Sequence, residues 1–469
     1  MSDQEYDFAV IGAGAAGLIA ADFAVKLGAR VVMLEKDRIG GDCTWTGCVP
    51  SKALLKVAKV AHNVRSSAQY GIVTQPPRVD MPQVREYLRA AIDHIYAGTT
   101  PDALRAKGMD VMLGPVQFLD AHTLQCGDQR LRARKILVAT GAAPVIPDIP
   151  GLDQVPFSTY LDFFDRDQLP ESLIIIGGGP IGVEMAQAYQ RLGVQVTVFA
   201  DRLLPKDKPE ASTTIQRILE REGVRVVQAR AQSVERLAEL IRVRSRNISV
   251  DAEALLVAAG RVPKLEGLNL AAAHIRYTSS SLTVNDKLCT SASHVYGAGD
   301  VLGGEQFSHL AGWQGFQAAR NALLPGSNPG FSTVVPHVTF SDPEVARVGL
   351  LESEARDQHS NNVHTGTWPL SRIDRAVCDN ELDGFIKVVT TNDGLLLGAT
   401  IVAEGAGETI IEFVYALQKK MKVSDMASPI HPYPTYTSGI QMLATEMAIK
   451  YAMTGFSGTL IRTASKVWR

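Results

Sequence analysis

The segment Tyr6-Asp-Phe-Ala-Val-Ile-Gly12-Ala-Gly14-Ala-Ala-Gly17 decides the fold of this chain. An apolar run ends at Ile11, and three glycines then follow in the spacing G-x-G-x-x-G. An apolar-periodic stretch covers Leu18 to Leu27, and a second apolar run, Arg30 to Leu34, ends at Glu35. This order of strand, glycine turn, helix, strand and acid, within about 30 residues, is the context that a dinucleotide-binding fold requires.

The residue types in this segment explain how a dinucleotide would be held. Gly12, Gly14 and Gly17 permit a tight turn and let backbone N–H groups approach a pyrophosphate, whose charge lies at the helix N-terminus. Glu35 would accept hydrogen bonds from the ribose hydroxyls. We therefore predict a nucleotide site at this turn.

The same pattern returns in the middle of the chain. The apolar run Leu173 to Ile176 precedes a second glycine turn, with a helix predicted over 183–192 and a strand over 195–199. The glycines of this second turn are Gly177, Gly179 and Gly182. Two nucleotide folds in one chain predict two bound dinucleotides.

The second copy lacks the ribose-binding acid of the first. Ala200 occupies that position, and Arg202, Lys206 and Lys208 follow it. Cations in place of the acid favour a 2′-phosphate, and hence NADPH over NADH, although Asp201 favours NADH.

A strand that runs into a glycine turn occurs twice more, once for each nucleotide fold. The run from Ile136 leads into Thr140 and Gly141, and the run from Ala254 leads into Gly260. Each is predicted to close the sheet of its own domain. After about residue 330, predicted strands over 333–340 and 384–389 and helices over 407–420 and 440–451 indicate a separate α+β unit.

Composition and charge narrow the class of protein. Lysine and arginine number 47 against 49 aspartates and glutamates, a net charge of −2, so no broad positive field favours nucleic acid. The odd count of five cysteines is typical of a reducing compartment. The acidic N-terminus and the lack of any run of 18 apolar residues predict a cytoplasmic protein without a membrane span.

The segment Gly40-Gly-Asp-Cys43-Thr-Trp-Thr-Gly-Cys48-Val-Pro-Ser-Lys52 carries the chemistry. Two cysteines five residues apart can close a small disulfide ring, and the N-terminus of a helix predicted over 51–60 would stabilise the thiolate of Cys48. A zinc site would need further ligands nearby, so no metal site is predicted.

With these motifs, Thr290-x5-Tyr296-Gly-Ala-Gly299-Asp300 and the segment from Pro336 to Gly349 complete a pattern that spans the chain in order. The pattern resembles the FAD-dependent pyridine nucleotide–disulfide oxidoreductases of class I, which include dihydrolipoyl dehydrogenase, glutathione reductase and mercuric reductase. The resemblance implies an α/β fold with two Rossmann-like domains, for FAD and NAD(P), and a C-terminal α+β dimerisation domain. The implied boundaries are 1–150 completed by 285–330, then 151–284, then 331–469.

The resemblance also implies where the cofactors bind. FAD would lie on the first glycine turn, with Asp300 at its ribityl–pyrophosphate region and Thr140 and Gly141 nearby. NADPH or NADH would lie on the second turn, and the C-terminal domain would build a homodimer.

The same resemblance assigns roles to the redox residues. Cys43 would be the interchange thiol that meets substrate, and Cys48 the thiolate against the flavin. Lys52 would lie near the flavin N5, with Glu184 as its ion-pair partner. The physical logic agrees, because a hydride can enter one flavin face while a thiolate on the other face takes the electrons.

The sequence departs from the family near its C-terminus, in Ile430-His431-Pro-Tyr433-Pro-Thr-Tyr436-Thr-Ser438-Gly439. Dithiol-using members carry a His as acid–base there, oriented by a carboxylate. Alignment on Pro-Thr, which we prefer, puts Tyr433 at the His position and Ser438 at the carboxylate position. Alignment on His-Pro retains His431 but puts Tyr436 at the carboxylate position, so the dyad is incomplete in either register. A tyrosine here resembles mercuric reductase, whose C-terminal cysteine pair this chain lacks.

These observations predict a homodimeric flavoenzyme that passes a hydride from NAD(P)H through FAD to the Cys43–Cys48 disulfide, and then to a thiophilic metal ion or another non-disulfide oxidant. The alternatives are a dihydrolipoyl dehydrogenase-like enzyme, in which Tyr433, His431 or water replaces the missing base, and a non-catalytic redox-sensing flavoprotein. The C-terminal segment 455–469, which mixes apolar and basic residues, is predicted to be a packed tail.

Overall fold

The computed structural model describes residues 4–453 and 455–468. The chain forms two compact units. The first consists of Met1–Gly177, Arg191–Val196 and Arg230–Ser332, and the second of Gly178–Gln190, Thr197–Ala229 and Thr333–Arg469.

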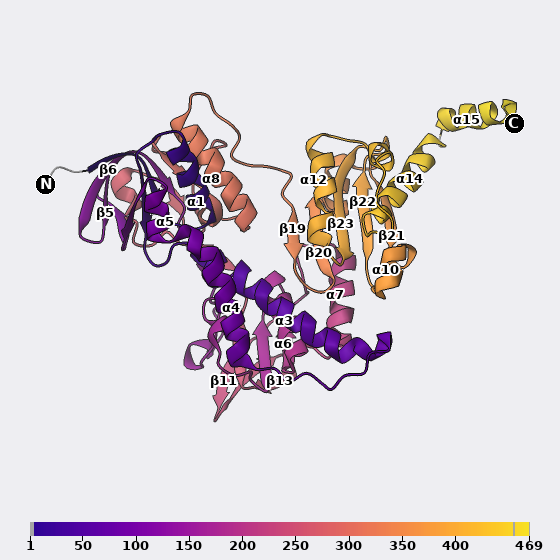
Figure 1. The fold of residues 1–469 in the computed structure, drawn as a ribbon, viewed down its shortest axis with the longest axis horizontal. Helices are drawn as coiled ribbons and strands as arrows, with labels where there is room; N and C mark the ends of the chain where they lie inside the picture. The colour runs from indigo at the N-terminus through magenta and orange to yellow at the C-terminus, as the bar shows by residue number, and fades with distance from the viewer. Residues whose placement is uncertain (1–3, 454, 469) are drawn as a thin grey trace. The chain divides into compact units, whose positions relative to one another are not determined.

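The first unit is built on a sheet with the strand order β3-β2-β1-β6-β5-β4, in which β18 also pairs with β6 (Figure 1). β1 pairs in parallel with β2 and with β6, so the carboxyl ends of these strands meet at one edge. The strands are β1 (Gln4–Ile11), β2 (Val31–Glu35), β3 (Met109–Leu113), β4 (Val116–Phe118), β5 (Thr123–Cys126), β6 (Gln129–Val138) and β18 (Val295–Gly297).

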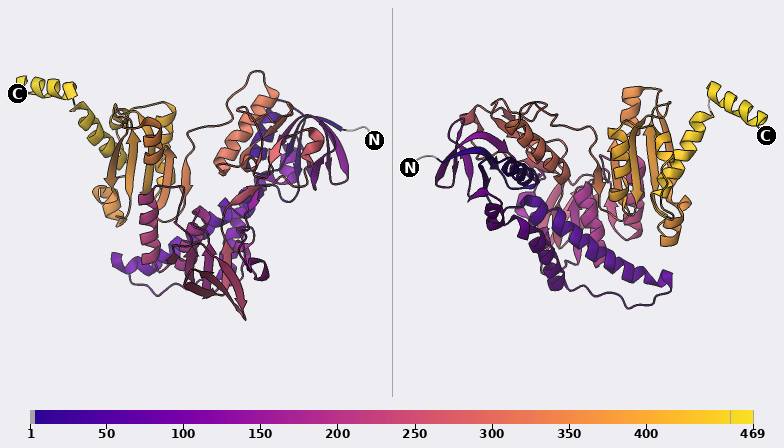
Figure 2. Two further views of the ribbon diagram at one scale, coloured as in Figure 1. Left: turned by 180° about the vertical axis from the view of Figure 1, so that it is seen from behind. Right: turned by 45° about the horizontal axis from the view of Figure 1, so that its top comes forward.

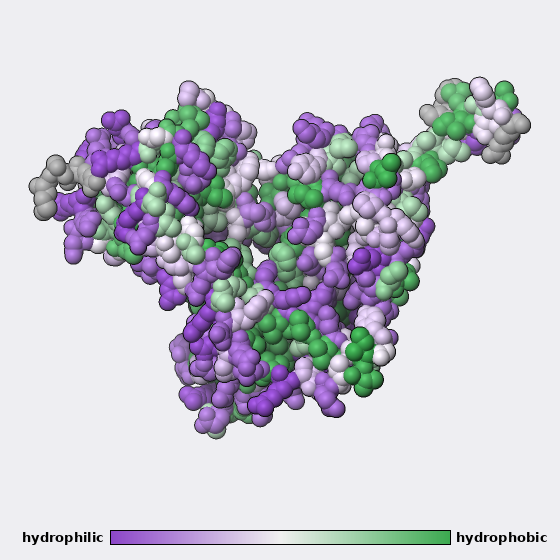
Figure 3. All heavy atoms as spheres, in the orientation of Figure 1, coloured by the Kyte–Doolittle hydropathy of each residue, from purple (hydrophilic) through white to green (hydrophobic). Residues whose placement is uncertain are grey.

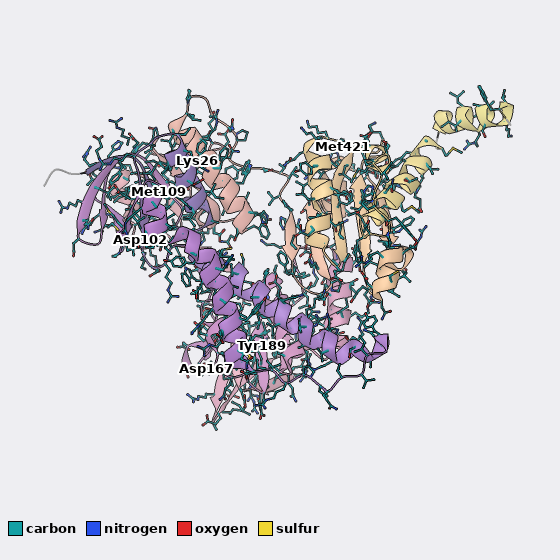
Figure 4. All side chains as sticks on the ribbon, viewed as in Figure 1. Lys26, Asp102, Met109, Asp167, Tyr189 and Met421 are labelled. Atoms are coloured by element: carbon teal, nitrogen blue, oxygen red, sulfur yellow. The ribbon has the colours of Figure 1, made fainter. Side chains whose placement is uncertain are left out.

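Helices α1 and α8 lie side by side against this sheet (Figure 1). Small residues make the close packing possible, because a side chain at Gly315 of α8 would meet the backbone of Ala16 on α1. Met109, labelled in Figure 4, is buried where β3 joins the same sheet. The helices of this unit are α1 (Ala15–Lys26), α2 (Gly41–Trp45), α3 (Cys48–Ser66), α4 (Met81–Tyr96), α5 (Pro101–Ala106) and α8 (Ser308–Leu323).

The second glycine turn follows β8 (Ser172–Ile176) and precedes α6 (Pro180–Leu192). β8 pairs in parallel with β14 (Ala254–Val257), and β9 (Gln195–Phe199) pairs in parallel with β10 (Arg225–Val227). Tyr189 of α6, labelled in Figure 4, is fully buried. The other elements of the middle segment are α7 (Pro209–Arg221), the antiparallel β11 (Ser233–Leu237), β12 (Leu240–Ser245) and β13 (Ile248–Ala252), and the paired β16 (Tyr277–Thr278) and β17 (Ser281–Leu282).

The C-terminal part is an α+β unit around an antiparallel sheet of order β19-β20-β23-β22-β21, seen from two further sides in Figure 2. α12 packs along β20 and β23, and α14 along β21 and β22. The strands are β19 (His337–Thr339), β20 (Glu344–Gly349), β21 (His364–Pro369), β22 (Phe385–Thr390) and β23 (Leu396–Ala403). The helices are α9 (Glu352–His359), α10 (Asp374–Asp379), α11 (Ala406–Thr409), α12 (Ile411–Gln418), α13 (Val423–Ala427), α14 (Ser438–Ala452) and α15 (Gly455–Val467).

Several predicted elements differ from those observed, and the helix predicted over 407–420 is divided into α11 and α12. The helix predicted over 51–60 begins at Cys48 and continues to Ser66, because its apolar positions persist beyond residue 60. The strand predicted over 333–340 is limited to His337–Thr339. The prediction of a packed tail was wrong for the described residues, since the side chains from 459 to 468 are exposed. Figure 3 shows apolar surface along the helices that lead to the C-terminus.

Within the described residues, no helix combines the length and the apolar composition needed to cross a membrane.

Lys208, which precedes α7, is buried without a hydrogen-bond partner among the described residues. Burial and the neighbouring charge of Lys387 lower the pKa of Lys208 to about 8. The nearby carboxylates already bond Lys387, whose Nζ lies 2.5 Å from Glu210 Oε1 and 2.8 Å from Glu352 Oε2. Lys208 is therefore a buried cation that weakens folding at neutral pH.

We expect Lys208→Met to stabilise the protein by about 1–3 kcal/mol at pH 7. The folded-state pKa lies below the unfolded value, so the penalty is complete below pH 8 and disappears as the folded state releases its proton at higher pH. Denaturant unfolding at pH 7 and pH 10 measures the effect, with the exposed Lys206→Met as control. An equal gain at both pH values would contradict this explanation.

Candidate active site

The first glycine turn is formed by backbones in direct contact. Gly12 has a φ of +101°, and a Cβ there would lie 2.3 Å from the carbonyl oxygen of Ala139. A Cβ at Gly17 would lie 1.9 Å from the carbonyl oxygen of Gly12. Gly14 is the N-cap of α1 and supplies no side-chain cap, so the N–H groups of the first helical turn point to the space before the helix.

Glu35 lies at this turn, at the end of β2. Its carboxylate accepts a hydrogen bond of 2.7 Å from the backbone N–H of Ala13 and one of 2.8 Å from that of Asp37. The structure therefore brings the acid predicted for the ribose to the glycine turn.

Thr140 and Gly141 follow β6 at the same sheet edge. Gly141 has a φ of +73°, and the Thr140 hydroxyl donates to the carbonyl of Lys264 at 2.6 Å. The next strand, β7 (Ala142–Pro144), pairs with β15 (Arg261–Pro263), which directly follows Gly260. The predicted glycine turns at Gly141 and Gly260 are thus joined through the pairing of β7 with β15.

The second glycine turn repeats the close backbone approach. A Cβ at Gly177 would lie 2.2 Å from the carbonyl oxygen of Ala258, whereas a Cβ at Gly179 would meet nothing within 4 Å. Gly182 lies in the first turn of α6. The exposed Arg202 donates to the carbonyl of Pro205, while the buried Lys208 does not face solvent. Arg202 and Lys206 therefore remain the accessible cations after β9.

Cys43 lies in α2, and Cys48 is the first residue of α3. Neither cysteine is in a disulfide in this structure, and both are half-buried. A hydrogen bond to Cys48, burial and the charge of Cys48 raise the pKa of the Cys43 thiol. The Cys48 sulfur also lies 3.3 Å from the Ser308 hydroxyl, which can donate to it. The raised pKa favours the protonated form of Cys43, whereas the Cys48 sulfur lies at the N-terminus of a 19-residue helix, a position that would stabilise a thiolate.

Lys52 and Glu184 belong to different compact units, and their pairing stays a prediction. Lys52 is one helical turn after Cys48 on α3. Glu184 is buried on α6, where its carboxylate accepts a hydrogen bond of 3.0 Å from the backbone N–H of Phe340.

His431 has the carboxylate partner that neither alignment supplied. Its Nε2 lies 3.1 Å from Glu412 Oε2, and its Nδ1 lies 3.0 Å from the carbonyl oxygen of Pro429. Both ring nitrogens thus lie within hydrogen-bond distance of acceptors of their own chain, and the tautomer decides which of them donates. The His431 side chain is only 8% exposed, so the ring is enclosed by groups of its own chain.

Tyr433 is exposed, and its hydroxyl donates to Asp374 Oδ2 at 2.6 Å. This hydrogen bond and the carboxylate charge raise the pKa of the Tyr433 phenol. Ser438 bonds the carbonyl of Thr435, and the Tyr436 hydroxyl donates to Asp379. At the position aligned with the family's His, the segment thus presents a phenol whose hydroxyl donates to Asp374.

Sequence reasoning missed Glu412 and Asp374 because they bond residues 19 and 59 positions away. No local spacing could have indicated either pair. Arg261 was also missed, although it directly follows the predicted Gly260; its side chain contacts both Asp42 and Asp300.

The two glycine turns, the acid at the first and the cysteine pair define the class of a two-nucleotide oxidoreductase with a redox disulfide. The family model described as pyridine nucleotide-disulphide oxidoreductase matches residues 6–323, and its dimerisation domain matches residues 335–444. The chain belongs to this family, whose members use FAD and NAD(P)H.

Several curated relatives are about one third identical to the chain. Mercuric reductase of Bacillus cereus is 33% identical over 447 residues, which cover 93% of this chain and 71% of that protein. Dihydrolipoyl dehydrogenase of Bacillus subtilis is 31% identical over 460 residues, which cover 93% of this chain and 96% of that protein.

Solved structures share the fold over nearly the whole chain. LpdA from Mycobacterium tuberculosis matches with a TM-score of 0.86 and 28% identity, covering 95% of this chain and 99% of that one. A Cu(II) complex of the HOCl-induced flavoprotein disulfide reductase RclA from Escherichia coli matches with a TM-score of 0.85 and 26% identity, covering 94% and 99%. The predicted fold class, enzyme class and cofactors are thus confirmed.

The residues present fit the two dinucleotides. The uncapped N-terminus of α1 and the open space at Gly179 offer backbone N–H groups to a pyrophosphate without a side chain in the way. FAD would be held by the first turn, Glu35 and Asp300, and NAD(P)H by the second turn.

We expect Gly17→Ala to remove FAD, because the added methyl group would displace the turn itself. The flavin absorbance per protein of the purified variant should fall at least about tenfold, as expected for a loss of more than ~1.4 kcal/mol of binding. Gly98→Ala, at a position with nothing within 4 Å of the added atom, is the matched control. Full flavin content in the Gly17→Ala variant would show that the turn does not hold FAD.

Proposed function

We propose that this FAD-dependent oxidoreductase delivers its electrons from the Cys43–Cys48 pair to a thiophilic metal ion. The single observation that carries the proposal is the placement of His431, whose two ring nitrogens both lie within hydrogen-bond distance of acceptors of its own chain and whose side chain is only 8% exposed. An acid–base group for dithiol exchange needs a nitrogen that can accept a proton. A metal ion that binds thiolates needs no such base.

Both the sequence relatives and the structural neighbours support a metal ion as the electron acceptor. Mercuric reductases are among the relatives, and the RclA neighbour forms a Cu(II) complex. Tyr433, held protonated by Asp374, would assist as a neutral oxygen ligand or proton donor.

The electrons and protons balance in this proposal. Bound FAD supplies the two-electron relay between NAD(P)H and the disulfide. Reduction of the Cys43–Cys48 disulfide by a hydride equivalent breaks the S–S bond and leaves a Cys43 thiol and a Cys48 thiolate. Two electrons then pass to one Hg²⁺ or to two Cu²⁺, the S–S bond forms again, and the Cys43 proton is released.

The family's dimerisation domain supports a homodimer as the working form. A cytoplasmic location is also part of the proposal, and the odd count of five cysteines in the sequence supports it.

We expect the wild-type protein to oxidise NADPH when Hg²⁺ or Cu²⁺ is added, and Cys43→Ala to lose this activity. Reduction of NAD⁺ or NADP⁺ by dihydrolipoamide should stay near background. The double variant Tyr433→His, Ser438→Glu should gain dihydrolipoamide turnover of at least about tenfold, because it restores the missing acid–base pair. Sustained turnover of dihydrolipoamide by the wild type, lost in Cys43→Ala, would instead identify a lipoyl dehydrogenase.

We also propose NADPH as the reductant, supported by the exposed Arg202 and Lys206 after β9. Arg202→Ala should raise the KM for NADPH about tenfold, the effect of one charge-assisted phosphate contact, and leave the KM for NADH unchanged. Initial rates with both nucleotides measure this, with the exposed Arg276→Ala as control. A wild-type preference for NADH above tenfold would show that Arg202 does not select the nucleotide.

A further inference from the structure

Arg261 joins the redox-cysteine helix to the FAD site. Its Nη2 lies 2.9 Å from Asp42 Oδ2, and its Nη1 lies 2.6 Å from Asp300 Oδ2. Asp42 directly precedes Cys43 on α2, and Asp300 lies on the short 3-10 helix η6 (Gly299–Leu302). One guanidinium therefore connects the helix that carries Cys43 with the short helix that carries Asp300, the residue assigned to the flavin ribityl chain.

Neighbouring groups hold this bridge in one geometry. The Tyr160 hydroxyl donates to Asp42 Oδ2 at 3.0 Å, and Arg261 Nε donates to the Tyr160 oxygen at 3.3 Å. The guanidinium also lies over the Tyr160 ring, 5.3 Å from its centroid. Lys264 Nζ is 3.5 Å from the other oxygen of Asp42. The guanidinium thus makes contacts in three directions, which the single ammonium of a lysine could not match.

The three side chains of the bridge are largely shielded from water, and charge–charge interactions are stronger there than at the surface. The side chains of Arg261, Asp42 and Asp300 are only 20%, 24% and 13% exposed. Burial raises the pKa of Asp300 above its usual value, and the charge of Arg261 opposes this rise. Without the arginine, two carboxylates would face each other in a partly buried site and would repel.

The bridge is compatible with bound FAD. Arg261 contacts the Oδ2 oxygen of Asp300, so the other oxygen, Oδ1, would be the one to accept from a ribityl hydroxyl. The backbone of Arg261 is fixed independently, because β15 pairs with β7 and Val145 N donates to the Gly260 carbonyl. The arginine is therefore a rigid link rather than a surface side chain.

We propose that Arg261 is a positioning residue that sets the place of the redox-cysteine helix relative to FAD, through the Asp42–Arg261–Asp300 bridge. The proposal rests on the assignment of Cys43 and Cys48 as the redox pair. Its effect falls on the exchange of electrons between flavin and disulfide, since α2 carries Cys43 and Asp42 together. The transfer of hydride from NAD(P)H to the flavin does not depend on α2 and should be spared.

The test uses the full-length FAD-loaded protein with Arg261→Met, Arg261→Lys and Asp42→Asn. Arg134→Met is the matched control, because Arg134 also faces two carboxylates, Glu5 at 3.5 Å and Asp7 at 3.7 Å, but is 69% exposed. Three quantities are measured: FAD affinity, the thiolate-to-flavin charge-transfer absorbance after anaerobic reduction, and the separate rates of flavin and disulfide reduction. Alkylation rates of the two cysteines in the FAD-free protein give a readout independent of turnover.

At saturating FAD, we expect Arg261→Met to reduce the charge-transfer absorbance and to slow disulfide reduction at least about tenfold, the effect of a small misplacement of reacting groups. Flavin reduction by NADPH should change less than twofold. Asp42→Asn should also reduce the charge-transfer absorbance and slow disulfide reduction. Arg261→Lys should lose less of both than Arg261→Met. The alkylation rates should change in Arg261→Met and stay constant in Arg134→Met.

Two results would overturn the proposal, and they are distinguishable. If Arg261→Met and Asp42→Asn lose only FAD affinity, and match the wild type once FAD is saturating, Arg261 binds the cofactor and does not position the cysteines. If the wild type shows no charge-transfer absorbance and equals Cys43→Ala and Cys48→Ala, the redox-pair assignment itself fails, and the bridge proposal fails with it. Should Arg261→Met not fold, Asp42→Asn and Arg261→Lys decide between the same outcomes.

Discussion

The close approach of the Gly12 backbone to the Ala139 carbonyl is the contact on which the first unit depends. β1 and β6 are parallel neighbours, and the chain can leave both at the same edge only if no side chain separates them. This contact places Glu35 beside the turn, and it directs Thr140 and Gly141 into the ribbon that carries Arg261. A steric condition on one glycine thereby organises the cofactor site and its connection to the cysteines.

The positions of charged and polar groups around the cysteines, His431 and Tyr433 then determine which chemistry the fold supports. In the cysteine pair the pKa of Cys43 is raised, while the Cys48 sulfur lies near the Ser308 hydroxyl and a helix N-terminus, which would stabilise a thiolate there. In the C-terminal unit, His431 and Tyr433 are both held by carboxylates of their own chain. The engagement of both side chains by these carboxylates supports the proposal of an acceptor that binds sulfur directly.

Sequence reasoning succeeded where the signal is local. Strand, turn and helix at both nucleotide folds follow from periodicity and glycine spacing, and the strand predicted over 195–199 has the observed bounds. Helix ends were less well predicted, because α3 begins at Cys48, three residues before the expected start. The exposed C-terminal helix was not predicted, since an amphipathic pattern does not tell whether a helix packs on its own chain.

The sequence by itself determined the two glycine turns, the cysteine pair and the family, because each depends on residues close together along the chain. Only the tertiary structure decided the partners of the charged groups. Arg261 bonds Asp42, 219 positions away in the sequence, and His431, which lies in a loop, contacts Glu412 of α12. Lys208 is buried instead of facing a nucleotide. The physical reason is that charge pairing depends on distance in space and on burial, neither of which a local pattern encodes.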